Sequence, residues 1–255
     1  MRTDITCALG GVSLHELDSR IFVENIKETP NTGIETAKRS GYGTFPMAEP
    51  ERISLVITVT VYVKERDRTA RQAVIDAIKG WCGQGWFTKS TKPGKRIYVF
   101  CTKMPEEEAF DVSSRMEIEF TAYGEAYWQN TNPSFVVPYD AVSSGNATLK
   151  TSGTQDCFLE ATITPSGGTL TSVSISVGNQ RLELTGLSVA NETQLRIYYD
   201  EMHILRIVNG STSLISKKTA DSSDDILLPP NASSTISFTF NTNCYYQFMA
   251  RGLWK

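Results

Sequence analysis

Histidine is nearly absent from this sequence: its 255 residues contain only two, His15 and His203. Neither belongs to an H-x-x-x-H or H-E-x-x-H motif, so a zinc site would need distant residues to converge without a spacing signal. The Gly-x-Ser-x-Gly elbow of hydrolases and the phosphate-binding P-loop are missing as well. Because catalysis needs titratable groups that a fold can bring together and tune, the sequence predicts no enzyme and no catalytic, cofactor-binding or metal-binding residue.

Paired cysteines and long apolar runs are also missing. The five cysteines include no C-x-x-C pair, and an odd count at low density argues against a disulfide framework, so we expect free thiols in a reducing cytoplasm. No apolar run approaches the roughly 18 residues of a membrane helix. Residues 1–11 lack the continuous apolar segment of a secretory signal. The sequence therefore predicts no membrane insertion.

Positive charge is too sparse for a nucleic-acid binder. The formal net charge is −3, and the single basic cluster is Lys89, Lys92, Lys95 and Arg96, beside Pro93. Affinity for nucleic acid depends on neutralising many phosphates, usually from a basic patch. A solvated turn explains the cluster better, so we expect no sequence-specific nucleic-acid binding.

Two acidic runs offer alternatives to this interpretation. Glu106–Glu108 with Asp111 could supply the carboxylate pair of a glycoside hydrolase, although contiguous acids in a predicted loop are more often solvated. Asp221, Asp224 and Asp225 could ligate calcium, but the run lacks the alternating spacing and distal glutamate of an EF-hand. Polar surface loops are the expectation for both.

The first half of the chain predicts mixed β structure with one helix. Ser54–Lys64 alternates between β-branched and polar residues, which is typical of a strand buried on one face. Arg96–Cys101 and Arg115–Tyr123 predict two more strands. After the first of these three strands, residues 68–80 have helical periodicity, with Trp81 on the apolar face. Thr69 and Gln72 resemble a capping box at the start of this helix.

The second half predicts an all-β domain of short alternating strands, a jelly-roll or galectin-like sandwich. Asn209-Gly210 predicts a tight hairpin. Residues 129–145 contain two prolines and no clear period, which indicates a linker. We therefore expect a mainly β protein with an N-terminal sandwich or split-barrel domain at 1–128, a linker at 129–145, and a C-terminal β-sandwich at 146–255.

A further segment, Thr29–Pro50, is rich in proline and glycine and predicts a long loop. Such loops in compact domains are usually functional or disordered. Tyr42, Phe45 and Met47 are apolar residues within it, and a partner surface explains them better than solvent does. We predict subunit contacts at these three residues, with a disordered loop as the alternative.

The order of these features resembles the distal tail proteins of siphophages. The most telling stretch is "PERISLVITVTVYVKERDRTARQAVIDAIKGWCG", an alternating strand followed by a short helix that ends in tryptophan. "GVSLHELDSRIFVENIKETP" precedes it, and "KPGKRIYVFC" and "SSRMEIEFTAYGEAYW" follow. In the second half, "GNATLKTSGTQDCFLEATITPSGG", "LRIYYDEMHILRIVNGSTSLI" and "DILLPPNASSTISF" resemble the galectin-like domain of the family.

The resemblance implies a structural protein of the virion tail, assembled in the host cytoplasm. Members form a hexameric ring at the tail tip that joins the tail tube protein to the tail hub or tail-associated protein. The N-terminal domain builds the ring, and the C-terminal domain docks receptor-binding proteins in some members. A carbohydrate-binding module of an adhesion protein is the alternative, because the second half is rich in tyrosine and phenylalanine that could stack on sugars.

Overall fold

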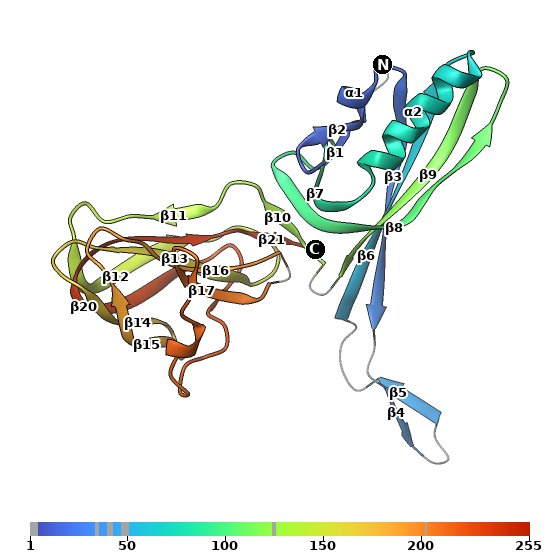
Figure 1. Ribbon diagram of the computed structural model, residues 1–255. Coiled ribbons are helices and arrows are strands. Elements are labelled where there is room, and N and C mark those ends of the chain that lie inside the picture. Colours follow the sequence, from blue (N-terminus) through green and yellow to red (C-terminus); the bar gives the residue numbers. More distant parts are fainter. Residues whose placement is uncertain (1–4, 34–35, 40–42, 47–50, 124–125, 202) are drawn as a thin grey trace. The chain divides into compact units, whose positions relative to one another are not determined.

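The computed structural model describes residues 5–33, 36–39, 43–46, 51–123, 126–201 and 203–255. Strands dominate it (Figure 1), so the expected mainly β fold is confirmed. The chain divides into two compact units, Met1–Trp128 and Gln129–Lys255. Strand β10 (Trp128–Asn130) contains the division between them. None of the helices in the described ranges is long and apolar enough to cross a membrane.

The first unit is built on one sheet in which neighbouring strands are antiparallel. In spatial order the strands are β2 (Val12–Ser13), β1 (Cys7–Leu9), β7 (Gln84–Lys89), β8 (Lys95–Ala109), β9 (Ser113–Tyr123), β6 (Glu51–Lys64) and β3 (Ile21–Gly33). On β6 the alternation predicted from the sequence is confirmed, since Leu55, Ile57, Val59, Val61 and Val63 are all fully buried.

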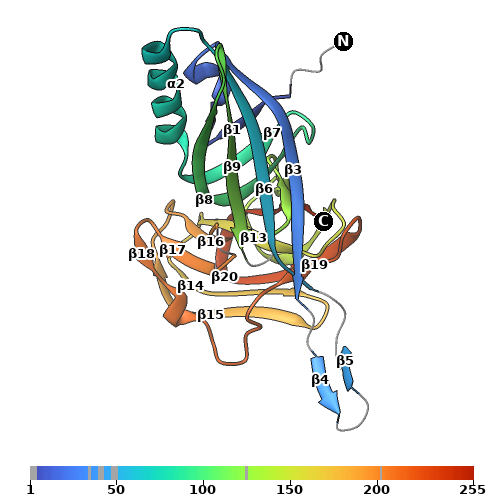
Figure 2. The same ribbon diagram turned by 90° about the vertical axis from the view of Figure 1, so that its right-hand side faces the viewer.

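Two helices accompany this sheet, the short α1 (Leu14–Leu17) and the longer α2 (Arg68–Trp81), which covers one sheet face (Figure 2). The expected packing of Trp81 on the sheet is confirmed, because its ring meets Phe120 of β9 at 5.7 Å. The expected capping box of α2 is wrong. The helix begins at Arg68, so Thr69 already lies inside it and cannot be the N-cap. The N-cap is Asp67, whose carboxylate accepts a hydrogen bond from the Ala70 amide at 2.7 Å.

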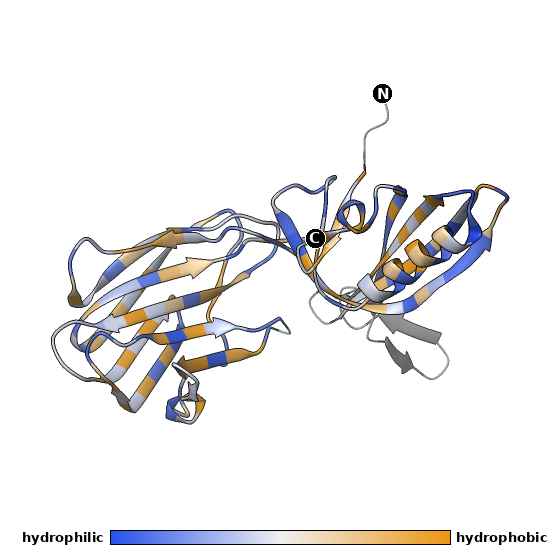
Figure 3. Ribbon diagram, turned by 45° about the horizontal axis from the view of Figure 1, so that its top comes forward, coloured by the Kyte–Doolittle hydropathy of each residue, from blue (hydrophilic) through white to orange (hydrophobic). Residues whose placement is uncertain are grey.

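The second unit is a β-sandwich whose strands alternate in hydropathy (Figure 3). Its main path runs β15 (Gln180–Val189), β14 (Leu170–Val177), β20 (Ser233–Ala250), β13 (Cys157–Pro165), β16 (Leu195–Tyr199), β17 (Leu205–Asn209) and β18 (Thr212–Ser213), all antiparallel. Beside this path lie β11 (Ser134–Val136), β12 (Val142–Lys150), β19 (Leu227–Leu228) and the 3-10 turn η1 (Ile215–Lys217), whereas β21 (Leu253–Trp254) pairs with β10.

Strand β20 organises the second unit. Its first half pairs with β12 and β14, and its second half pairs with β11 and β13. Phe238 and Phe248, one from each half, lie 5.6 Å apart by ring centroid and are buried. One strand therefore contributes aromatic side chains to the core from both halves of the sandwich.

The segment 129–145, which we expected to be a linker between domains, contains strand β11 and the start of β12. β11 pairs with the end of β20, with Phe135 opposite Met249, and β12 begins at Val142. Backbone hydrogen bonding to a distant strand, which a local composition does not reveal, makes this segment part of the second unit.

The hairpin predicted at Asn209-Gly210 is present between β17 and β18, displaced by one residue. Asn209 pairs with Thr212, so the central turn residues are Gly210 and Ser211. Gly210 has φ +57°, and a glycine with positive φ at the first central position is typical of a type II′ turn.

Candidate functional site

The predicted contact segment contains more β structure than expected. Residues Thr29–Gly33 continue β3 and pair with the start of β6, while β4 (Thr36–Arg39) and β5 (Gly43–Pro46) form a two-stranded ribbon (Figure 1). The long-loop expectation is therefore wrong for these stretches. Pro30 does not prevent pairing because β3 is the last strand of the sheet path, and proline is tolerated at an edge.

Of the three predicted contact residues, the structure describes only Phe45. Phe45 belongs to β5, opposite Ala37 of β4. Tyr42 and Met47 lie outside the described residues. Their role in subunit contacts therefore remains a prediction.

Carboxylates of both acidic runs have partners nearby. Glu106–Glu108 lie in the far half of β8 and not in a loop, because the strand continues past Pro105 through two irregularities in its pairing with β9. Glu107 accepts a hydrogen bond from Ser114, and Glu108 lies 3.7 Å from Arg115. In the second run, Asp224 pairs with Lys218 at 3.0 Å. Carboxylates with these partners are consistent with surface structure.

The two histidines lie in different units. His15 Nδ1 is 3.0 Å from the Ile21 carbonyl, whereas His203 stacks on Phe158 at 5.1 Å between ring centroids. Burial lowers the pKa of His203 despite the nearby Asp200. Among the described residues, no group of three or more histidine, cysteine or acidic side chains is arranged to hold a metal ion.

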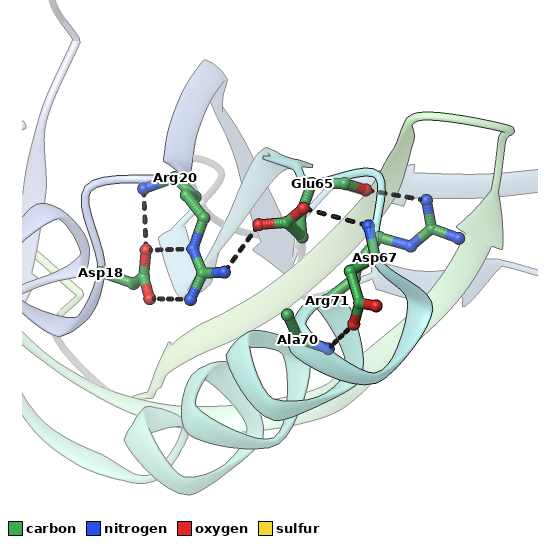
Figure 4. Close-up of polar contacts among 6 residues, drawn as sticks. All are labelled: Asp18, Arg20, Glu65, Asp67, Ala70 and Arg71. Atoms are coloured by element: carbon green, nitrogen blue, oxygen red, sulfur yellow. Dashed lines mark hydrogen bonds and ion pairs between the residues drawn. The ribbon is translucent and has the colours of Figure 1, made fainter.

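An arginine network connects the turns at one end of the first unit (Figure 4). Arg20 donates to both carboxylate oxygens of Asp18 and to Glu65 at 2.7–2.9 Å, and these hydrogen bonds lower the pKa of Asp18 to about 2. Arg71 of α2 is only 4% exposed and donates to the backbone carbonyls of Glu65 and Phe110. The network fixes the start of α2 against the β8–β9 turn, which is a structural role.

A second polar cluster, the Glu28 cluster, joins strands that are far apart in the sheet path. We define it as Glu28 of β3, Lys89 of β7, Lys92 and Trp128. Lys89 Nζ donates to Glu28 Oε1, and Oε2 accepts from Lys92 Nζ at 2.9 Å and from Trp128 Nε1 at 3.2 Å. The two ammonium groups also lie 5.4 and 4.8 Å from the centroid of the buried Trp128 ring.

The Glu28 cluster corrects the expectation that the basic turn is solvated. The Lys89 side chain is only 7% exposed. Since β3 and β7 are separated by three strands along the path, contact between them requires the sheet to curl, as expected for a split barrel. One sequence signal was available: Lys89 is two residues from the buried Phe87, so both face the core side of one strand.

The second unit exposes aromatic side chains along one edge of β20. Phe135, Tyr139 and Tyr245 are 60%, 98% and 50% exposed. The connection that carries Tyr139 runs from Val136, opposite Phe248, to Val142, opposite Cys244, so it flanks Tyr245. We call these three residues the aromatic edge.

Among the other aromatic residues of the second half, which could also have stacked on sugars, Tyr246 and Phe248 are buried in the core. Trp254 donates to Asn130 at 2.8 Å, and Tyr199 stacks on Phe158 at 4.3 Å. Packing within the sandwich therefore accounts for these four residues. Phe135 and Tyr139 were missed because they fall in the segment expected to be a linker.

No family model and no curated protein sequence matches this chain. Solved structures do. The crystal structure of the SPP1 Dit protein, described as a paradigm of the hub adsorption apparatus in phages that infect Gram-positive bacteria, matches with a TM-score of 0.70 and 13% identity, covering 97% of this chain and 98% of that chain.

Chains of the phage p2 baseplate in its activated conformation match as well. With strontium the TM-score is 0.54, and with calcium it is 0.51, both at 8% identity and over 97% of this chain. They are covered over 97% and 98% of their own lengths. The resemblance to distal tail proteins is thus confirmed as a likeness of fold along almost the whole chain, and the protein has the fold of the phage tail hub protein Dit.

Proposed function

We propose that the protein is a structural component of a phage or prophage tail tip and has no enzymatic activity. In this role six copies form a ring that joins the tail tube protein to the tail hub protein. The second unit then offers a docking surface for a receptor-binding protein. The observation that carries the proposal is the match to the SPP1 hub protein across both units, at 97% and 98% coverage.

The open sheet of the first unit supports self-association. Its path ends at β3, a strand of 13 residues whose outer edge has no neighbour along that path. Exposed strand edges are prone to pair with another chain unless they are covered. A closed ring is one arrangement that covers the same edge on every copy.

The mass of the purified protein in solution tests the proposal. We expect light scattering across a concentration series to approach six times the chain mass, and negative-stain images to show closed rings. A strict monomer at high concentration, also in the presence of a tail tube protein, contradicts it.

A separate variant tests the predicted contact segment. Gly33 and Glu51 are opposite each other in the β3–β6 pair, so an Asn-Gly turn can replace residues 34–50 without disturbing the strands below. We expect a folded monomer, because the apolar contacts are removed. A second variant keeps the full length of the segment and changes Tyr42, Phe45 and Met47 to serine. It should weaken the oligomer to a similar extent, because it removes the same apolar side chains. An unchanged oligomer in both variants refutes the contact role while leaving the ring itself intact.

The aromatic edge favours carbohydrate binding by the second unit as a second candidate function. Exposed aromatic rings give sugars an apolar face to stack on, and each contact contributes modestly. Glycan binding measured for wild type and for the Tyr139→Ala/Tyr245→Ala variant tests it, with an expected loss of at least tenfold in affinity. Tyr123→Ala, which removes a tyrosine 52% exposed on the first unit, is the control. Equal binding by both variants, or none by wild type, excludes this candidate.

A further inference from the structure

Two of the five thiols differ from the others in their surroundings. All five cysteines lie within the described ranges and are free. Cys7, Cys157 and Cys244 are buried at 3%, 0% and 0% exposure, whereas Cys82 and Cys101 are both partly exposed. Only the last two are therefore open to a reagent in solution while the protein stays folded.

The fold brings Cys82 and Cys101 together. Cys82 is the C-cap of α2, and its amide donates to the Ile78 carbonyl at 3.1 Å. The next residue, Gly83, accepts a hydrogen bond from the Cys101 amide of β8 at 2.8 Å. Gly83 and Cys101 are therefore neighbours, and Cys82 directly precedes Gly83 in the chain. Each of the two thiols also shifts the pKa of the other, as neighbouring side chains do.

Packing on both sides keeps these residues in place. Trp81, adjacent to Cys82, meets the Phe120 ring edge-on and donates from Nε1 to the Val12 carbonyl at 2.8 Å. Phe120 is in turn directly opposite Cys101 in the β8–β9 register. The end of α2 and this part of β8 are thus held together by contacts that do not depend on the sulfurs.

We propose that Cys82 and Cys101 are a site of oxidative modification, at which a small-molecule disulfide converts the two thiols into an intramolecular disulfide. The Cys101 or Cys82 thiolate attacks the reagent, forms a mixed disulfide and releases one small thiolate. The other cysteine loses its proton and attacks the sulfur attached to the protein, releasing the second small thiolate. The protein loses two electrons and two protons, and the reagent is reduced to two thiols.

The surroundings of the two thiols set the rate of this exchange. Burial raises the pKa of Cys82 to about 12 and also raises the pKa of Cys101. Because the thiolate is the attacking species, the reaction is slow near neutral pH and accelerates with alkalinity. A protein made in a reducing cytoplasm therefore keeps both thiols there and acquires the cross-link only after long exposure to an oxidising medium.

The cross-link closes the segment 82–101, which contains β7 and Lys89 of the Glu28 cluster. A disulfide stabilises mainly by restricting the unfolded chain. The oxidised protein is therefore expected to melt at a higher temperature than the reduced protein, and reductant should reverse the change.

The test incubates the full-length wild-type protein with oxidised glutathione at pH 8.5, followed by denaturation and thiol counting. We expect reactive thiols to fall from five to three, and non-reducing peptide mass spectrometry to show one Cys82–Cys101 cross-link lighter by two hydrogens. At pH 7 the same loss should be at least tenfold slower.

Two variants complete the experiment. Cys82→Ser should retain a single glutathione adduct at Cys101 and show no cross-link, whereas Cys244→Ser should cross-link as wild type does. Separate glutathione adducts on both Cys82 and Cys101 of the wild type, or five unmodified thiols after prolonged oxidation, overturn the proposal. The wild-type spectra alone decide the outcome if a variant fails to fold.

Discussion

Replacing Glu28 by glutamine is expected to lower the free energy of unfolding of the first unit by about 3 kcal/mol, as is typical when one partner of a buried ion pair is removed. The substitution keeps the size of the side chain but leaves Lys89, 7% exposed, without its counter-charge and beside the Lys92 ammonium. Urea titration followed by tryptophan fluorescence measures the effect, because Trp81, Trp86 and Trp128 all belong to the first unit.

The pH dependence of this loss follows from the pKa of Glu28. Burial alone would raise that pKa, but the hydrogen bonds and charges of Lys89 and Lys92 outweigh it and hold the pKa below the ordinary value of 4.5. Since the folded state has the lower pKa, the stabilisation is fully present above pH 4.5 and is lost as the pH falls below it. The difference between wild type and Glu28→Gln should therefore shrink between pH 6 and pH 3.

Glu24 provides a matched control on the same strand. Its side chain is 48% exposed and lies 3.6 Å from Arg115. An exposed pair of this kind contributes between about 0 and 1 kcal/mol, so Glu24→Gln should change the unfolding free energy little. The Lys89→Met change made together with Glu28→Gln should recover part of the loss, because it removes the uncompensated buried charge. Equal effects of Glu24→Gln and Glu28→Gln would show that the Glu28 cluster does not hold the curled sheet together.

Replacing Gly153 by alanine is expected to lower the melting temperature of the second unit by about 10 °C, which corresponds to about 3 kcal/mol for a unit of this size. Gly153 has φ +116°, and a Cβ there would lie 2.4 Å from the Leu253 carbonyl oxygen and 2.8 Å from its nitrogen. Both atoms belong to the backbone of β21, so relief requires that strand to move.

Displacement of β21 would break specific hydrogen bonds. The Thr154 amide donates to the Leu253 carbonyl at 2.8 Å, and Trp254 donates to Asn130 at the same distance. Differential scanning calorimetry measures the shift. Gly178→Ala is the control, because Gly178 has φ +57° but no atom within 4 Å of the added Cβ, so only the backbone cost of about 1 kcal/mol applies. If Gly153→Ala has the same melting temperature as Gly178→Ala, the close approach of Gly153 to β21 does not constrain the second unit.

Local patterns predicted much of this fold. The alternation in Ser54–Lys64, the helical period after Arg68 and the glycine at 210 each depend on residues within about a dozen positions of one another, and the structure places β6, α2 and the β17–β18 hairpin there. The mainly β class followed from the same short-range signals. The predicted ends of the elements were less accurate: α2 is capped by Asp67, two residues before the expected Thr69.

The candidate sites were predicted less well, because each is made by residues far apart in the sequence. The Glu28 cluster joins residues separated by 61 and 100 positions, and the aromatic edge depends on the pairing of β11 with the end of β20. In both places local composition pointed elsewhere, to a solvated basic turn and to a proline-containing linker.

The class of fold and the type and approximate position of its strongest elements can be read from local patterns, since burial on one face of a strand or helix imposes a period that any short window reveals. Local patterns do not reveal that Lys89 is buried, that Thr29–Gly33 belongs to a strand, or that Cys82 and Cys101 are neighbours. These outcomes depend on which strands pair and how the sheet curls. Both are set by the free energy of the whole core and not by any segment alone.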